Sequence, residues 1–422
     1  MIDNSLIAYQ NEQLRKTPTT FHRYMYDRIH WDNKMLGLVG PRGVGKSTLL
    51  LQHLAQSPER EQSLYISADS IYLTTHTLVE LADTFVKYGG VRLYIDEVHK
   101  YKNWSRELKQ IYDTHSSLKV VFTGSSILDI VEGEADLSRR APIYHMQGLS
   151  FREYMALFHQ IELPVYSLEQ ILKHEEMAVM KTVEHPLMYF KQYMQNGYYP
   201  FSNEPDFALR IEQIVRQTIE SDIAQYADLK ASTARKLIQL MGVISGIAPM
   251  KPNADSLSQE VGVSKNNIPD YLVYLEKAGM IGQLRDNTGG LRGLGKVEKV
   301  YIDNPSLMTV LAYGNPEKGN LRETFFYNQT RVNNDVMSSR VSDFTIGDYT
   351  FEVGGKKKGN KQIEDVPNGI VVKDDIEYGF LNVVPLWAFG LQRLPLLGSY
   401  FFKQPDIVKR ATEGRQHKGL HR

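Results

Sequence analysis

A glycine-rich run of nine residues constrains the fold more than any other stretch: Gly40-Pro41-Arg42-Gly43-Val44-Gly45-Lys46-Ser47-Thr48. Its spacing, G-x-x-x-x-G-K-[ST], is typical of loops whose backbone N–H groups surround nucleotide phosphates. Lys46 would bring a positive charge to the β- and γ-phosphates, and the Ser47 hydroxyl is placed to ligate Mg²⁺. A buried strand expected over 35–39 and an amphipathic helix over 47–56 would set the loop at a helix N-terminus, where anions bind. The pattern predicts an ATP and Mg²⁺ site in an α/β fold with a parallel sheet. The alternative is an accidental glycine-rich turn.

An acidic strand end provides the second half of this site. Strands and helices alternate after the loop, with strands expected over 63–67 and 91–97 and a helix over 75–88. The strand over 91–97 ends in Asp96 and Glu97. A carboxylate at the carboxyl end of a central strand can hold Mg²⁺ through water, and the next acid can polarise the attacking water. We therefore assign Asp96 to the metal and Glu97 to the general base, the alternative being a solvated acidic turn.

Composition bounds the remaining possibilities. The 422 residues suffice for about three domains. Lys plus Arg and Asp plus Glu are 49 each, so a nucleic-acid surface has to be a local patch. The absence of cysteine excludes disulfides, Cys-zinc sites and thiol nucleophiles. No apolar run approaches the length of a membrane span and the N-terminus lacks a signal-peptide pattern, so we expect a soluble, cytoplasmic protein with no membrane partner.

Several motifs, in this order, resemble a family of prokaryotic AAA-type ATPases whose C-terminal domain has no known function. They are the glycine-rich loop, YIDEVHK (94–100), VFTGSS (121–126), LSRRA (137–141), LSFREY (149–154), NGYYPF (196–201) and FEVGGKKKGNKQI (351–363). The resemblance implies that Ser125, at the end of a strand over 118–126, senses the γ-phosphate; Ser125 could equally cap the helix that begins at Ile127. It also implies that Arg139 or Arg140 is an arginine finger reaching a neighbouring subunit's site. The alternative is a surface pair that bridges Glu132, Glu134 or Asp136.

The chain divides into five expected segments. They are an ATPase core (1–154), a helical lid or linker (155–230), a winged helix-turn-helix (231–305), a restriction-endonuclease-like α/β domain (315–405) and a basic tail (406–422). In the third segment, Ser264 would cap a second helix over 265–277, with Pro269 kinking it or shortening its first turn, and strands over 280–284 and 297–302 would flank a wing.

The helix-turn-helix segment carries the residues expected to meet DNA. Lys265, Asn266 and Asn267 lie at the front of the second helix, where contacts to bases or phosphates are made. The wing adds the basic side chains Arg285, Arg292 and Lys296. The alternative is a subdomain that serves packing or a partner contact.

Two carboxylates face each other in the expected C-terminal hairpin. Pairing about Gly347-Asp348 puts Asp343 directly across from Glu352, and such cross-strand partners lie roughly 5 Å apart. This arrangement resembles the metal site of restriction-endonuclease-like folds. Glu323, on a preceding helix at 321–331, and Gln362 are further candidates for it. The lysine of that pattern is missing at Gly354, and Lys356 is the candidate in its place. The site is either intact or a relic in a domain that binds DNA or a partner.

These features favour an oligomeric AAA-type motor or remodeller that hydrolyses ATP and acts on DNA, with a homo-oligomeric, hexameric ring as its expected assembly. One alternative is a nucleotide-controlled signalling or defence switch that binds a protein partner. The other is an ATP-regulated, metal-dependent nuclease.

Overall fold

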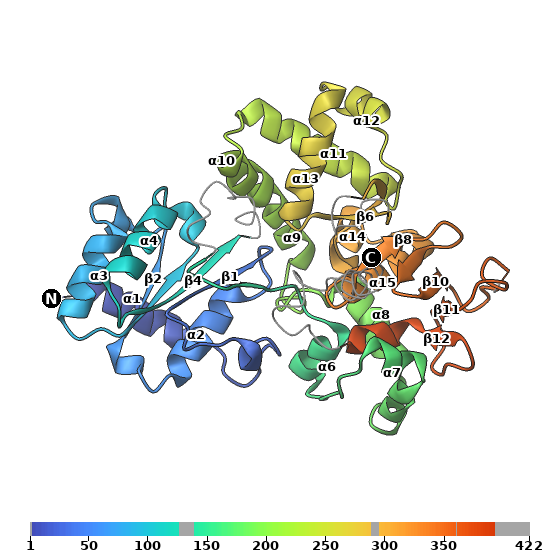
Figure 1. Cartoon of the computed structure of the whole chain (residues 1–422), viewed down its shortest axis with the longest axis horizontal. Helices are drawn as coiled ribbons and strands as arrows, with labels where there is room; N and C mark the ends of the chain where they lie inside the picture. The colour runs from blue at the N-terminus through green and yellow to red at the C-terminus, as the bar shows by residue number, and fades with distance from the viewer. Residues whose placement is uncertain (1, 126–138, 288–294, 360, 393–422) are drawn as a thin grey trace, which may run out of the picture.

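The computed structural model of the chain describes residues 2–125, 139–287, 295–359 and 361–392. Figure 1 shows a first sheet with its helices on one side of the molecule, a helical body that includes α11–α13 at the top, and a second sheet on the opposite side. No helix among these residues is long and apolar enough to cross a bilayer.

The first sheet is fully parallel, with the strand order β2-β3-β4-β1-β5. Its four longer strands are almost continuously buried because helices cover both faces, as parallel sheets require. One face packs on α2, and the other on α3 and α4. Their bounds are β1 Met35–Gly40, β2 Ser63–Ser67, β3 Arg92–Asp96, β4 Lys119–Ser125, β5 Ile143–His145, α1 Asn4–Lys16, α2 Lys46–Gln56, α3 Leu78–Lys87 and α4 Trp104–Thr114. Short 3₁₀ turns connect them: η1 Tyr26–Arg28, η2 Arg60–Gln62, η3 Ile71–Thr74 and η4 Val98–Lys100.

The helical segment after the first sheet divides between two cores. Its elements are α6 Phe151–His159, α7 Leu168–Leu172, η7 Glu175–Lys181, α8 Pro186–Asn196, α9 Phe207–Gln217, the π-helix η8 Thr218–Ile223 and α10 Ala224–Tyr226. Side chains of α6–α8 pack into the core of the second sheet, whereas α9 and η8 pack into the core that contains α2. The segment expected to be one lid, 155–230, thus belongs to two packing units.

The segment predicted to be a winged helix-turn-helix follows. It consists of α11 Ala231–Ile247, α12 Ala254–Val261, η9 Lys265–Asn267, α13 Ile268–Lys277 and the antiparallel strands β6 Ile281–Arg285 and β7 Val297–Ile302. Gly262 ends α12 in a left-handed conformation, and Ser264 accepts a hydrogen bond from the backbone N–H of Asn266. Because Pro269 tolerates only the first turn of an α-helix, α13 begins at Ile268 and not at Lys265. The winged helix itself stays a prediction.

The second sheet is mixed, with the order β12-β11-β10-β9-β8. The elements are α14 Pro305–Leu311, α15 Lys318–Thr330, β8 Val336–Ser338, β9 Phe344–Ile346, β10 Tyr349–Gly354, β11 Gly369–Lys373, β12 Val383–Pro385 and η10 Leu386–Leu391. β9 and β10 pair in the predicted register, with Ile346 opposite Tyr349 and Phe344 opposite Phe351. The strand expected to begin at Val341 begins at Phe344, the first of these residues whose side chain is buried.

Candidate functional site

The glycine-rich loop leads from β1 into α2. Gly43 (φ +79°) and Gly45 (φ +98°) adopt left-handed conformations that side-chain-bearing residues rarely take, and α2 begins at Lys46, directly after Gly45. The Lys46 ammonium donates hydrogen bonds of 2.8 Å to the backbone carbonyls of Gly40 and Pro41. Desolvation inside the loop lowers the pKa of Lys46 to about 8, against the opposing charges of Asp96 and Glu97. The loop therefore holds a helix N-terminus and a lysine together, as anion binding requires.

Asp96 ends β3, and buried hydroxyls fix its carboxylate. The Tyr65 hydroxyl donates a 2.8 Å hydrogen bond to one oxygen, and the Thr123 hydroxyl donates to the other. Asp96 is 5% exposed. Together with the Ser47 hydroxyl, this carboxylate offers the hard oxygen ligands that Mg²⁺ prefers, so the donor set fits the ion.

Glu97 follows Asp96 in a left-handed conformation (φ +53°), which turns its side chain out of the strand direction. Its backbone N–H donates a 2.9 Å hydrogen bond to the Thr123 hydroxyl. Burial raises the pKa of Glu97, and the charge of Asp96 acts in the same direction against that of Arg42. A carboxylate with a raised pKa is suited to accept a proton near neutral pH.

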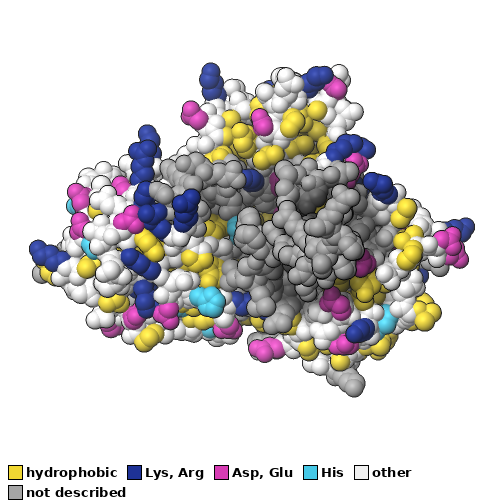
Figure 2. All heavy atoms as spheres, in the orientation of Figure 1, with side chains coloured by type: hydrophobic (Ala, Val, Ile, Leu, Met, Phe, Trp, Pro, Cys, Tyr) yellow, Lys and Arg dark blue, Asp and Glu magenta, His cyan; other side chains and the backbone are white. Residues whose placement is uncertain are grey.

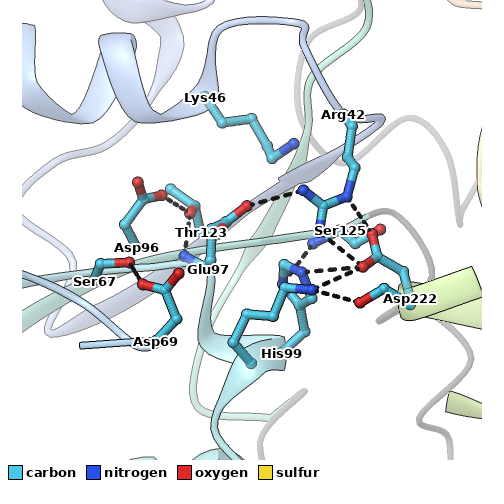
Figure 3. A network of polar contacts seen from close by, with 12 residues as sticks. Arg42, Lys46, Ser67, Asp69, Asp96, Glu97, His99, Thr123, Ser125 and Asp222 are labelled. Carbon is cyan, nitrogen blue, oxygen red and sulfur yellow. Dashed lines mark hydrogen bonds and ion pairs between the residues drawn. The ribbon is translucent and has the colours of Figure 1, made fainter. Parts of the chain in front are cut away.

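Ser125 lies at the carboxyl end of β4 and is 2% exposed. Its backbone N–H donates a 3.3 Å hydrogen bond to Nδ1 of His99, a residue of the YIDEVHK motif to which the sequence assigned no role. The helix that Ser125 was expected to cap lies outside the described residues. Figure 3 shows Ser125, His99, Glu97 and Lys46 around one region beyond the carboxyl ends of the strands.

Arg42 makes a contact that sequence reasoning missed. Its guanidinium donates bidentate hydrogen bonds of 2.7 and 2.8 Å to the carboxylate of Asp222, which lies in η8 (Figure 3). A third nitrogen lies 3.4 Å from a Glu97 oxygen. Asp222 is separated from Arg42 by 180 positions, and the only local signal is an acid among buried apolar neighbours of η8, Ile219 and Ile223.

The loop is also covered by residues of the NGYYPF motif and by α9. A Cβ at Gly43 would lie 2.9 Å from the Phe201 ring and 3.1 Å from the Ile214 side chain. The glycine is therefore required twice, for its backbone conformation and for this close approach. These contacts place α9 and the connection that precedes it directly against the loop.

The two candidate finger arginines differ in their surroundings. Arg140 pairs with Asp113 at 3.0 Å and lies over the Tyr112 ring. Arg139 is exposed. Glu132, Glu134 and Asp136, the alternative partners of these arginines, lie outside the described residues.

The helix-turn-helix presents a mixed surface. Lys265, Asn266 and Asn267 are exposed, although Lys265 lies 3.3 Å from Asp255. Arg285 forms an ion pair with Glu276 at 2.8 Å, and Lys296 pairs with Glu298 at 3.3 Å. The third basic residue of the wing, Arg292, lies outside the described residues. On the face in Figure 2, side chains of both signs of charge occur over the N-terminal domain and over α11–α13.

In the C-terminal hairpin, lysines lie against the carboxylates. Lys299 is 3.1 Å from Glu323 and 3.5 Å from Asp343. Lys358, and not the expected Lys356, contacts Glu352, because the chain turns after Gly354 and brings the Lys358 stem against that glycine. The Gln362 amide also lies against Glu352. Burial and the charge of Glu323 raise the pKa of Asp343 to about 6.

No group of three or more acidic or His side chains within the described ranges is arranged to hold a metal ion. As they lie, these carboxylates fit the two lysines better than a cation between them. The second metal site stays a prediction.

A phosphate-binding loop and an acidic strand end at one edge of a five-stranded parallel sheet define a P-loop ATPase domain. Residues 32–155 match the AAA domain family, which makes this part of the chain an AAA-type ATPase domain. Residues 188–318 match a domain of unknown function (DUF8612). A comparison with curated proteins gave no match.

Solved structures give weak similarity over about two thirds of the chain. The Thermotoga maritima RuvB Holliday junction branch migration motor is 16% identical with a TM-score of 0.28, over 65% of this chain and 89% of that one. AMPPCP-bound DnaA from Aquifex aeolicus is 12% identical with a TM-score of 0.25, over 64% and 87%. The Saccharomyces cerevisiae Hsp104–ADP complex is 19% identical with a TM-score of 0.28, over 64% and 37%.

Proposed function

We propose that this chain is an ATP-hydrolysing motor or remodeller that works as a homo-oligomeric ring, hexameric in our prediction, and acts on DNA. One observation carries the hydrolytic part: the Lys46 loop and the Asp96–Glu97 strand end lie at the same edge of one parallel sheet. Nucleotide phosphates bound by the loop would lie beside both carboxylates.

Each residue then has a role in hydrolysis. The loop amides and Lys46 bind the β- and γ-phosphates, and Ser125 contacts the terminal phosphate from β4. Mg²⁺, held by Ser47 and Asp96, would neutralise phosphate charge. Glu97 orients the attacking water and accepts its proton, for which burial already raises its pKa.

Two substitutions test this assignment. Lys46→Ala should abolish binding of a fluorescent ATP analogue, because the loop loses its cation. Glu97→Gln should bind ATP normally and turn it over at least about a hundredfold more slowly, the scale of a lost general base. A normal rate in Glu97→Gln would exclude Glu97 as the base.

The exposed polar residues at the front of the second helix of the helix-turn-helix support contact with DNA. Lys265, Asn266 and Asn267 all face solvent. DNA should stimulate ATP turnover and bind with a salt dependence, because phosphate contacts release counterions. Lys265→Glu should weaken that binding, whereas Lys87→Glu, an exposed lysine on α3, should not. If no DNA in a panel of different structures changes the rate of ATP turnover, the proposal is contradicted.

A nucleotide-controlled switch that binds a protein partner is the second candidate. The pairing of Arg285 with Glu276 favours it, because an arginine expected to meet DNA is held within the domain. Turnover indifferent to DNA would select this candidate.

For the C-terminal domain, we propose a binding role. Lys299 and Lys358 support it, because they compensate carboxylates that a nuclease would use to hold a metal. Cutting of DNA in Mg²⁺ or Mn²⁺, abolished by Asp343→Ala, would overturn this proposal in favour of a nuclease.

A further inference from the structure

A second set of charges surrounds Asp222, beyond the residues that the ATPase motifs identify. Its carboxylate is fully buried, with 0% of the side chain exposed. Arg42 binds it through two hydrogen bonds, and the Lys100 ammonium lies 3.2 Å from the same carboxylate and 2.8 Å from the Ser221 hydroxyl. Nε2 of His99 lies 3.7 Å away. We call Arg42, His99, Lys100 and Asp222 the Asp222 network.

The network joins the phosphate loop to the helical segment. Arg42 belongs to the loop, His99 and Lys100 follow the catalytic strand, and Asp222 lies in η8, which is continuous with α9 and α10. η8 is a π-helix of six residues, a rare conformation that occurs frequently at functional sites. Because α9 also contacts Gly43 through Ile214, a movement of Arg42 and a movement of this helix cannot be independent.

Arg42 binds the carboxylate of Asp222 in the way that an arginine binds a phosphate. Burial of Asp222 would raise its pKa, but the hydrogen bonds and charge of Arg42, with Lys100 and His99, keep it below its ordinary value. Burial lowers the pKa of His99 to about 4, so the cations near neutral pH are Arg42 and Lys100. A planar guanidinium binds a carboxylate and a phosphate with the same bidentate geometry. Two anions, Asp222 and a phosphate on the loop, can therefore use the same arginine.

We propose that Asp222 and the terminal phosphate of a nucleoside triphosphate compete for Arg42, so that Arg42 signals the γ-phosphate to the helices that contain Asp222. This inference rests on nucleotide binding by the loop. Arg42 lies four positions before Lys46, and the charges of Arg42 and Asp222 both act on the Lys46 ammonium. A diphosphate lacks the competing group and leaves the Arg42–Asp222 pair in place.

The competition also involves the general base. Arg42 lies 3.4 Å from Glu97, so an arginine that turns to the terminal phosphate leaves Glu97 free to orient water. Arg42 is therefore a positioning residue, and its effect depends on whether the nucleotide carries a γ-phosphate.

The first test measures nucleotide discrimination. Affinities of the full-length chain for a non-hydrolysable ATP analogue and for ADP are compared by calorimetry, for wild type, Asp222→Asn and the control Glu220→Gln. Glu220 is the exposed acid of the same π-helix. Asp222→Asn should bind the triphosphate about tenfold more tightly, the gain expected when a competing conformation held by nine molecules in ten is removed. Its ADP affinity should stay within about twofold of wild type, and Glu220→Gln should match wild type for both ligands.

Arg42→Gln provides the reciprocal result. It should lose triphosphate affinity while keeping ADP affinity, so the ratio of the two affinities falls toward one. A change of both affinities by the same factor, in either variant, would mean a structural role and would overturn the proposal. Unchanged affinities in Asp222→Asn would overturn it as well.

A measurement on the wild-type chain covers the case in which Asp222→Asn does not fold. Amide hydrogen exchange of 218–226 should accelerate when the ATP analogue is added and not when ADP is added, because only the former releases Asp222. Equal exchange with both nucleotides would overturn the competition while leaving ATP binding intact. A wild-type chain that binds neither nucleotide would overturn the proposed function together with this inference.

Discussion

Lys46 is the residue on which nucleotide binding depends most directly, and its environment makes that binding sensitive to pH. Part of its surface faces solvent, yet its ammonium lies inside the loop, where desolvation lowers its pKa to about 8. A lysine binds phosphate as a cation, so the binding-competent form dominates below pH 8 and is lost above it. We expect ATP affinity to fall about tenfold between pH 7 and pH 9, as the protonated fraction does.

Calorimetry at both pH values, in buffers of different ionisation enthalpy, would detect the loss and the proton taken up at pH 9. Lys46→Arg is the control, because a guanidinium keeps its charge throughout this range. The same affinity for wild type at pH 7 and pH 9 would show that the Lys46 ammonium keeps its ordinary pKa.

A buried ion pair between Arg23 and Glu153 supports the glycine-rich loop. Arg23 donates to the Val44 carbonyl in the loop at 2.8 Å and pairs with Glu153 at 2.7 Å, both side chains being almost fully buried. Removing one member of such a pair leaves an uncompensated charge. We expect Glu153→Gln to reduce stability by about 3 kcal/mol, measured by chemical or thermal unfolding. Glu162→Gln, an exposed glutamate beyond the same helix, should have no measurable effect.

Sequence reasoning locates site residues that belong to short, continuous motifs. The loop, Asp96 and Glu97 are short motifs at strand ends, and the structure brings them to one sheet edge. Asp222 and Arg42 meet across 180 positions, and no periodicity links them. Likewise, Lys358 and not Lys356 contacts Glu352, because the chain turns after Gly354. The alternation of side chains along a strand does not predict such a turn.

At the scale of elements, local signals predicted most strands closely. The hairpin of β9 and β10 has the expected register because Gly347, in a left-handed conformation, fixes a two-residue turn. The helix expected from Lys265 differs in its first turn, where Pro269 favours a 3₁₀ start. Such differences fall at element ends, where helices fray and a terminal turn is often 3₁₀.

Asp343, next to the β9–β10 hairpin, should make the second sheet less stable as pH rises from about 4 to 6. Burial and the charge of Glu323 raise the folded pKa of Asp343 to about 6, above its ordinary value of 3.8. Between these values the folded state binds more protons than the unfolded state, so stability falls from about pH 4 to pH 6 and is level above. Asp343→Asn should remove this dependence and increase stability at pH 7 by up to about 3 kcal/mol.

Hydrogen exchange of residues 344–354 would measure this change in stability between pH 5 and pH 7. The exchange is followed with a chelator present and corrected for intrinsic rates. Asp348→Asn is the matched control, since Asp348 is exposed in the turn of the same hairpin. A hairpin of Asp343→Asn with unaltered protection at pH 7 would contradict the pKa shift.

At the scale of the whole molecule, one core runs from the first sheet through α9 and α11 to α14, and a second joins α6–α8 to the C-terminal sheet. Sequence reasoning located the AAA domain, because its motifs are local patterns. The bounds of the five segments stay a prediction. Sequence reasoning could not foresee that 155–230 divides between two cores, since the apolar faces of α6–α8 and α9 look alike until their partners are known. The helices that contact the glycine-rich loop therefore share one hydrophobic core with α11–α14.

In a ring, a neighbouring subunit would add an arginine to each ATPase site. The surroundings of Arg139 and Arg140 indicate which of the two this is. Arg140 is held by Asp113 within its own subunit, whereas Arg139 faces solvent. We therefore predict that Arg139 completes the site of a neighbouring subunit. Arg139→Ala should abolish turnover while preserving nucleotide binding. Lys46→Ala should also be inactive but still present its own Arg139, so co-assembly of the two variants should restore about a quarter of wild-type turnover, the share of sites with intact loop and neighbour in a random ring.

The complementation separates an arginine that acts in trans from one that only supports its own subunit. Differently tagged subunits are co-expressed, purified through both tags and assayed against each variant alone. Arg140→Ala with Lys46→Ala is the control: its activity should equal the sum of the separate variants, because the Asp113 pair serves only the subunit that contains it. Recovery by the Arg140 mixture instead would reverse the assignment. No recovery in either mixture would place both arginines outside the neighbouring site and remove the reason for a ring, since each ATPase domain would then be complete within one chain.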